Sequence, residues 1–263
     1  MAELSRKLEI KELKDFLDEK VEIYQSPKFI PTDPIQIPHK FSVKEDIEIA
    51  GFLAATIAWG NRKSIINNSN KMMDLLDSDP YNFVMNHSEN DLNPLNDFVH
   101  RTFNGLDFIT FIKGLQHIYR EHQGLENIFK KYATKEGLQS SIHHFKKHFF
   151  EIDHLKRSQK HISDPLKKSA AKRINMFLRW MVRPSNAGVD FDIWSSISPS
   201  LLSCPLDVHS GRIARQLGLL KRKQNDALAV HELDTFLREL DPSDPAKYDF
   251  ALFGLSAFEK ELF

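Results

Sequence analysis

The amino-acid sequence predicts an all-α fold, and three observations support this. Apolar residues recur at helical spacing in segments from one end of the chain to the other. No segment shows the sustained alternation of apolar and polar residues that is typical of a half-buried strand. Hydrophobic residues make up 41% of the 263 residues, enough to bury a substantial core rather than remain disordered.

The expected helices are separated by breaks that contain proline, glycine or asparagine. The first helix is followed by an irregular, proline-studded arm over 26–38. The second begins at Ser42, where Glu45 completes a capping-box pattern. The helices are expected over 3–19, 42–58, 63–76, three or four segments within 80–150, 169–183, a segment after Asp207 that ends near Gly218, 225–240 and 243–255.

The helix expected over 169–183 has two distinct faces. Its apolar face consists of Ile174, Phe177, Leu178 and Met181. Lys172, Arg179 and Arg183 fall on the opposite face, where an ordinary surface lysine would look the same as a functional one. Further along the chain, Asp207 stands directly before the next helix, as an N-cap residue does.

Two motifs in this region resemble the helix-hairpin-helix DNA glycosylases. The segment 205–219, Pro-Leu-Asp-Val-His-Ser-Gly-Arg-Ile-Ala-Arg-Gln-Leu-Gly-Leu, resembles the segment that carries their essential aspartate, which reads Val-Asp-Thr-His before a basic helix in endonuclease III relatives. The segment Lys-Arg-Ile-Asn-Met-Phe, 172–177, is similar to the lysine-bearing helix of the archaeal 8-oxoguanine glycosylase branch. The spacing between lysine and aspartate is also nearer to that branch, and the whole chain resembles a bacterial family of unknown function placed in this superfamily.

The hairpin itself departs from the family pattern. Members carry an apolar residue followed by Pro-Gly-apolar-Gly, whereas residues 163–169 read Ser-Asp-Pro-Leu-Lys-Lys-Ser and contain no glycine. Glycines at these positions let backbone amides approach a phosphate closely. Without these glycines, the hairpin is expected to differ in geometry from that of the family, and the position of the catalytic lysine depends on that geometry. Lys167 and Lys168 are therefore the alternative candidates to Lys172.

The resemblance implies a two-lobed helical architecture with a central cleft. One lobe would cover residues 41–183 and include the hairpin-like region, and the other would combine 1–40 with 184–263. Lys172 would then reach the cleft from the first lobe, and Asp207 from the second.

The resemblance also implies base-excision repair. Such an enzyme flips a damaged base out of double-stranded DNA and cleaves its N-glycosidic bond, and an oxidised purine is the candidate lesion. Asp207 would stabilise the positive charge that develops on the sugar. Lys172 would attack the sugar as an amine and form a Schiff base, which permits AP-lyase activity. The alternative is a catalytically silent nucleic-acid-binding protein that keeps the fold.

The candidate DNA contacts fall into three groups. In the first, the resemblance places Trp59 where the family often carries a residue that wedges into the duplex, although a Trp buried where two helices meet is the preferred interpretation. The second group surrounds the start of the aspartate helix. The third group belongs to segment 140–173, which contains nine basic and only three acidic residues although the whole chain has zero net charge. Such an excess of positive charge favours a surface that binds a polyanion. An ordinary solvated helix face is the alternative. The contacts are Trp59, Asn61 and Arg62, then His209, Ser210 and Arg212, then Lys167, Lys168 and Arg173.

Composition limits the other function classes. The single cysteine, Cys204, leaves no disulfide framework and no four-cysteine iron–sulfur cluster, and it favours a reducing, cytoplasmic compartment. His144 and His148 are spaced like a metal-binding pair, but no further ligand pattern accompanies them, so a polar surface is the preferred interpretation. We therefore expect no metal and no cofactor, no membrane segment, and a monomer.

Overall fold

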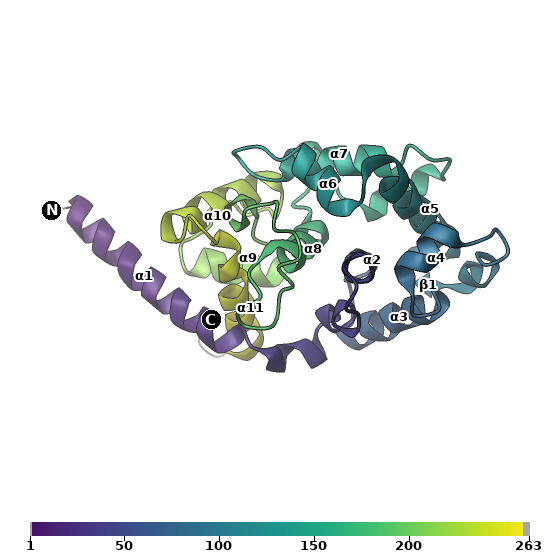
Figure 1. The fold of residues 1–263 in the computed structure, drawn as a ribbon. Helices are drawn as coiled ribbons and strands as arrows, with labels where there is room; N and C mark the ends of the chain where they lie inside the picture. Colours follow the sequence, from purple (N-terminus) through teal and green to yellow (C-terminus); the bar gives the residue numbers. More distant parts are fainter. Residues whose placement is uncertain (1, 260–263) are drawn as a thin grey trace. The chain divides into compact units, whose positions relative to one another are not determined.

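The computed structural model describes residues 2–259, with side chains from residue 9 onward, and it confirms the all-α fold (Figure 1). The chain forms two compact units. Unit 1 comprises residues 1–29, 135–137 and 165–263, and unit 2 comprises residues 30–134 and 138–164. This partition differs from the expected boundaries, because the helix that carries Lys172 belongs to the same unit as Asp207.

Unit 2 is built around its second and fifth helices. Helix α2 packs against α3 and α4, and helix α5 packs against α4, α6 and α7. The long helices and the single hairpin are α2 (Lys44–Thr56), α3 (Arg62–Leu75), α4 (Pro80–Asn86), β1 (Val99–His100), β2 (Phe103–Asn104), α5 (Gly105–His122), α6 (Leu125–Lys131) and α7 (Gln139–Phe149). Short 3₁₀ turns cover Pro27–Thr32 at the unit boundary, Pro34–Gln36, Pro38–Lys40, Asn93–Asp97 and Lys156–His161.

Phenylalanine rings fill the core of unit 2. The Phe52 ring lies 5.8 Å from the Phe111 ring and 5.5 Å from the Phe145 ring, measured between centroids. Phe149 packs against Phe111 at 5.0 Å, and all four side chains are fully or almost fully buried. These contacts join α2, α5 and α7, and aromatic pairs at such distances add stabilisation beyond the area that they bury.

A short antiparallel hairpin was missed by the sequence analysis. Val99 pairs with Asn104 and His100 with Phe103, and Arg101 takes a left-handed backbone conformation in the turn. Each strand has only two residues, too few for a period-two pattern to be detected.

Unit 1 is formed by segments that are distant in sequence. Helix α1, purple in Figure 1, lies along the yellow α11, which also packs against α9. The elements are α1 (Ala2–Tyr24), α8 (Lys172–Val182), α9 (Val208–Gln216), α10 (Ala227–Leu240) and α11 (Tyr248–Phe258), with 3₁₀ turns at Pro165–Lys167, Pro199–Leu201 and Pro245–Lys247. Leu17, Leu206, Ile213, Leu233 and Leu252 are among the residues of its core.

Two local predictions were wrong. The capping box at Ser42 does not form, because α2 begins at Lys44 with Val43 at its N-cap and no side-chain cap. Arg179 and Arg183 are not on a solvated face of α8, since only 4% and 2% of their surfaces are exposed. Carboxylates from elsewhere in unit 1 surround both guanidinium groups, which makes burial of the two charges possible.

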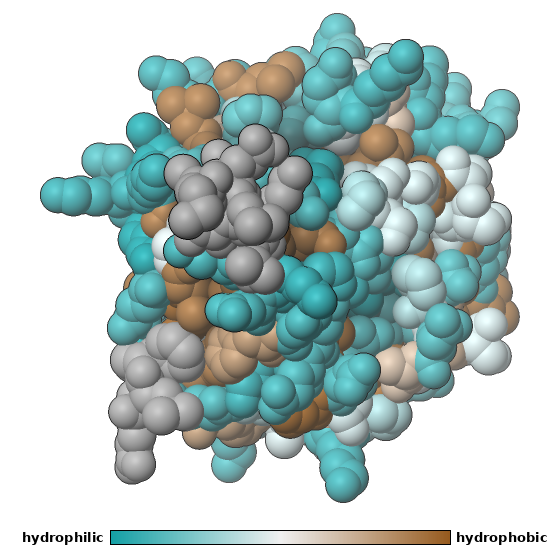
Figure 2. All heavy atoms as spheres, turned by 90° about the vertical axis from the view of Figure 1, so that its left-hand side faces the viewer, coloured by the Kyte–Doolittle hydropathy of each residue, from teal (hydrophilic) through white to brown (hydrophobic). Residues whose placement is uncertain are grey.

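Among residues 2–259, no helix is both long and apolar enough to cross a membrane. Hydrophilic side chains cover much of the face drawn in Figure 2, with apolar side chains scattered between them.

Candidate functional site

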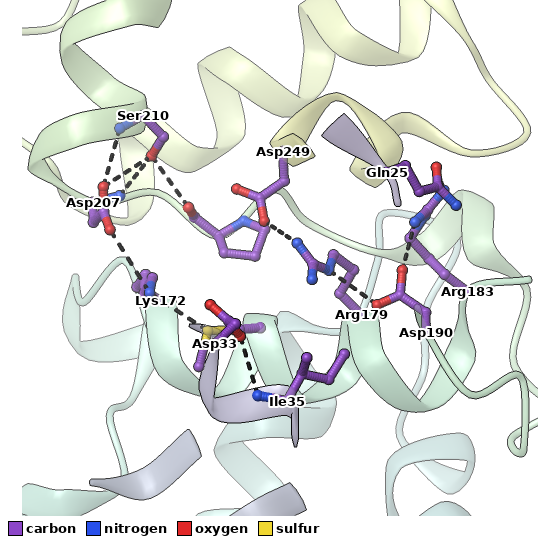
Figure 3. Close-up of polar contacts among 12 residues, drawn as sticks. Gln25, Asp33, Ile35, Lys172, Arg179, Arg183, Asp190, Asp207, Ser210 and Asp249 are labelled. Atoms are coloured by element: carbon purple, nitrogen blue, oxygen red, sulfur yellow. Dashed lines mark hydrogen bonds and ion pairs between the residues drawn. The ribbon is translucent and has the colours of Figure 1, made fainter. Parts of the chain in front are cut away.

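Asp207 is held by the helix that it caps. Its Oδ1 accepts hydrogen bonds from the backbone amides of His209 at 2.8 Å and Ser210 at 3.0 Å. Figure 3 shows the contact with Ser210. The Ser210 hydroxyl accepts in turn from the Asp207 amide at 2.9 Å, which completes a reciprocal cap. One carboxylate oxygen is therefore fixed by the N-terminus of α9, and Oδ2 is left to face outward from the cap.

Lys172 lies opposite this second oxygen. Its Nζ is 3.7 Å from Asp207 Oδ2, within ion-pair range but too long for a direct hydrogen bond. The two side chains remain 30% and 36% exposed, respectively. Unit 1 thus brings together the two predicted catalytic residues in a pair that solvent and a ligand can reach.

Asp249, which the sequence analysis missed, adjoins this pair. It comes from α11, is 8% exposed, and pairs with the guanidinium of Arg179. Burial raises the pKa of the Asp249 carboxyl; the positive charges of Arg179 and Lys172 oppose this rise, and the negative charge of Asp207 adds to it. A carboxylate inside the apolar run Tyr248–Phe253 was the signal that could have identified it.

The glycine-free hairpin region contains two strained backbone positions. Lys168 has φ 69° and Ala171 has φ 47°, in the left-handed region that glycine adopts without cost. Counted from Pro165, Lys168 occupies the place of the second glycine in the Pro-Gly-apolar-Gly pattern. The chain therefore takes a glycine-like conformation there without a glycine.

The residues predicted around the aspartate helix differ in accessibility. The His209 side chain is exposed, whereas Ser210 is 3% exposed and its hydroxyl is engaged within the cap. Arg212 donates to Gln216 Oε1 and Ser256 Oγ, both at 3.3 Å. Of these three residues, His209 presents the most accessible polar group.

The residues predicted near Trp59 lie in unit 2 and begin α3. Asn61 caps this helix by accepting from the Ser64 amide at 3.1 Å, and Arg62 is exposed. The partly buried Trp59 ring packs edge-on against His100 at 5.1 Å. Packing thus accounts for part of the Trp59 surface.

The basic cluster is divided between the two units. Lys167 and Lys168 are exposed in unit 1. Arg173 is only partly exposed, and burial lowers the pKa of its guanidinium. Lys146 in unit 2 donates to the Ile162 carbonyl at 2.6 Å, so its ammonium also has a structural role.

Fold and site together define an all-α protein in which a helix-borne lysine faces the aspartate that caps a second helix. A family model described as a protein of unknown function, DUF2400, matches residues 33–258, and the chain belongs to this family. No curated protein and no solved structure matches the chain.

Proposed function

We propose that the protein is a DNA glycosylase of the helix-hairpin-helix type that removes a damaged base from double-stranded DNA. The observation that carries the proposal is the placement of Lys172 Nζ 3.7 Å from Asp207 Oδ2, with both groups solvent-accessible. The sequence resemblance assigns these same two residues the roles of nucleophile and carboxylate. The glycine-like conformation of Lys168 adds support, because it falls at a glycine position of the hairpin pattern.

In the proposed reaction, the two groups act on the sugar of a flipped nucleotide. As the bond between the sugar C1′ and the base breaks, positive charge develops on the sugar, and the Asp207 carboxylate stabilises it. The N-terminal amides of α9 hold this carboxylate in place through Oδ1. The base leaves with the electron pair of the broken bond and takes up a proton. The Lys172 amine, once it has given up its proton, forms a bond to C1′; cleavage of the C1′–O4′ bond then opens the sugar ring, O4′ takes up a proton, and a Schiff base results. Loss of a proton from C2′ and departure of the 3′-phosphate complete the β-elimination that cleaves the strand.

Borohydride trapping on duplexes with abasic sites and with a panel of damaged bases tests this proposal. Lys172→Ala should abolish the trapped adduct, while water can still support some base release. Asp207→Asn should lower base release by roughly 10²-fold or more, because it removes the charge with little change of shape.

Matched controls exist within unit 1. Lys223 is an exposed lysine, and Asp226 caps α10 as Asp207 caps α9. Lys223→Ala and Asp226→Asn should trap and release base like the parent. If Lys172→Ala traps as well as the parent, the assignment of the nucleophile is wrong. If the parent binds duplex DNA but neither traps nor releases any base, the catalytically silent nucleic-acid-binding protein becomes the better proposal.

A further inference from the structure

A second group of chemically active side chains lies in unit 2, outside the Lys172–Asp207 site. His117 and His122 come from the last two turns of α5, and Glu151 follows α7. One ligand atom from each of these three residues lies within 4.8 Å of the other two. The five-residue spacing of the histidines is not a familiar metal-binding pattern, so the sequence alone drew attention to His144 and His148 instead.

Two of the distances within this group are close to those between ligands of one metal ion. Glu151 Oε2 is 3.3 Å from His117 Nε2 and 3.7 Å from His122 Nε2. Two ligands at tetrahedral angles, each about 2.0–2.1 Å from Zn²⁺, are separated by roughly 3.3–3.5 Å. Small side-chain movements would therefore bring all three atoms to bonding distance of a common centre.

One polar atom of this group, His122 Nε2, makes no hydrogen bond with the other residues of the group. His122 Nε2 is buried and has no hydrogen-bond partner among the described residues. Its distance from Glu151 Oε2 is too long for a hydrogen bond. A bound cation would give this nitrogen the direct polar contact that residues 2–259 do not supply.

A second layer of contacts orients the carboxylate. His148 Nδ1 lies 2.9 Å from Glu151 Oε1, and His148 Nε2 lies 2.9 Å from the Tyr132 hydroxyl. Both contacts are satisfied if Nδ1–H donates to the carboxylate and Nε2 accepts from the tyrosine. Glu151 Oε2 then remains directed at the two other histidines, as the outer partners of metal ligands commonly ensure.

We propose that His117 Nε2, His122 Nε2 and Glu151 Oε2 bind one divalent transition-metal ion of the zinc class, with water at a fourth position. Two imidazoles and one carboxylate suit Zn²⁺, whereas Ca²⁺ and Mg²⁺ prefer sites made entirely of oxygen ligands. The ion would join the end of α5 to the end of α7 within unit 2. This inference does not depend on the function proposed for unit 1.

Zinc titration of the full chain tests the site. The protein is stripped with a chelator, dialysed, and titrated with Zn²⁺ against a chromophoric competitor, and retained metal is counted by mass spectrometry. We expect one tight equivalent per chain and a melting temperature that rises with zinc. Mg²⁺ at the same concentration should produce neither effect.

Variants identify the ligands. His117→Gln and Glu151→Gln should each weaken zinc binding at least 100-fold, and His148→Gln should weaken it 10- to 100-fold because it only orients Glu151. His144→Gln is the matched control on α7, since His144 stacks on Tyr132 at 4.0 Å and is not one of the proposed ligands; it should bind zinc like the parent.

The parent protein alone can overturn the proposal, so the test does not require that every variant folds. If the stripped parent takes up no saturable equivalent of zinc, the site does not exist. If His117→Gln and Glu151→Gln fold, as judged by circular dichroism, and still bind zinc like the parent, the ion binds elsewhere. If His144→Gln loses as much zinc affinity as His117→Gln and Glu151→Gln, the assignment of the ligands is also contradicted.

Discussion

The two ends of α8 carry the same kind of charge in opposite settings. At its start, Lys172 and Asp207 are both about one-third exposed and stand 3.7 Å apart. At its end, Arg183 is 2% exposed and makes a two-point contact with Asp244, at 2.9 Å from Nε and 2.7 Å from Nη2. Arg183 also pairs with the fully buried Asp190.

This difference separates a charge that is enclosed in the fold from one that is accessible to solvent. The buried cations are enclosed by fixed carboxylates, and Arg183 in addition lies over the Phe250 ring at 5.3 Å. Burial opposes the charge of Arg183, but its hydrogen bond with Asp244 and the charge of Asp190 outweigh burial and raise its pKa. Lys172 has no comparable enclosure, so losing it should cost little stability.

The largest expected effect is on the buried end. Arg183→Met keeps much of the side-chain volume but leaves Asp190 and Asp244 without their main partner, and it should lower the free energy of unfolding by about 3–5 kcal/mol. The matched change Lys172→Met should cost at most about 1 kcal/mol. Urea denaturation of both variants checks the comparison, which fails if the two losses are equal.

A smaller effect concerns a buried carboxylate whose cationic partner is more distant. Asp234 is 4% exposed, accepts from the Cys204 amide at 2.9 Å, and lies 3.9 Å from Arg238 Nη1. Burial raises its pKa to about 6, above the ordinary value of 3.8. The folded state thus binds the proton more tightly, and this contribution to stability is greatest below pH 4 and is lost as the pH rises through about 6.

Asp234→Asn should remove this pH dependence. The amide oxygen can still accept from Cys204, so the variant should gain up to about 3 kcal/mol relative to the parent at pH 7 and little at pH 4. Urea denaturation between pH 4 and pH 8 measures the difference. A constant offset between the two proteins across this range would show that the pKa of Asp234 is not raised in the folded state.

The next effect concerns the exposed end. Asp207→Ala removes the cap of α9 and should cost about 1 kcal/mol, whereas Asp207→Asn retains a capping oxygen and should cost only a few tenths. Thermal denaturation of both variants is the measurement. A loss of about 3 kcal/mol or more in Asp207→Asn would place Asp207 with the structural charges rather than the accessible ones.

The smallest effect should be a gain. Lys168→Gly relieves a left-handed backbone conformation and should stabilise the protein by about 0.5 kcal/mol, after the larger chain entropy of glycine is subtracted. Lys168→Val at the same position should destabilise it. If the glycine variant is the less stable of the two, backbone strain at Lys168 is not significant.

Much of the helical pattern could be predicted because it depends on local signals. Apolar spacing and the breaks between segments predicted three or four helices within 80–150, where the structure has α4 to α7. The start of α2 could not be predicted in the same way. Ser42 and Glu45 match the capping-box pattern, but the helix begins at Lys44 and no side chain caps it. Local signals indicate that a helix exists more reliably than where it begins.

The site could be predicted only in part, because much of it depends on contacts distant in sequence. The motifs around Lys172 and Asp207 identified two residues that the fold brings together. The burial of Arg179 depends on Asp190 and Asp249, and nothing within α8 indicates their approach. The grouping of His117, His122 and Glu151 likewise exists only once α5 and α7 have packed.

The interrupted course of the chain through unit 1 has a consequence for synthesis. Lys20 on α1 pairs with Glu259, 239 residues later, and all of 30–134 and 138–164 is made between them. A growing chain therefore releases α1 long before α11 exists to cover it, while unit 2 can complete its core first. We expect unit 1 to fold last and slowly, because its closing contacts have a very large sequence separation. Until α11 has been made, the apolar side chains of α1 lack the helix that covers them, and we expect them to be open to a chaperone during that time.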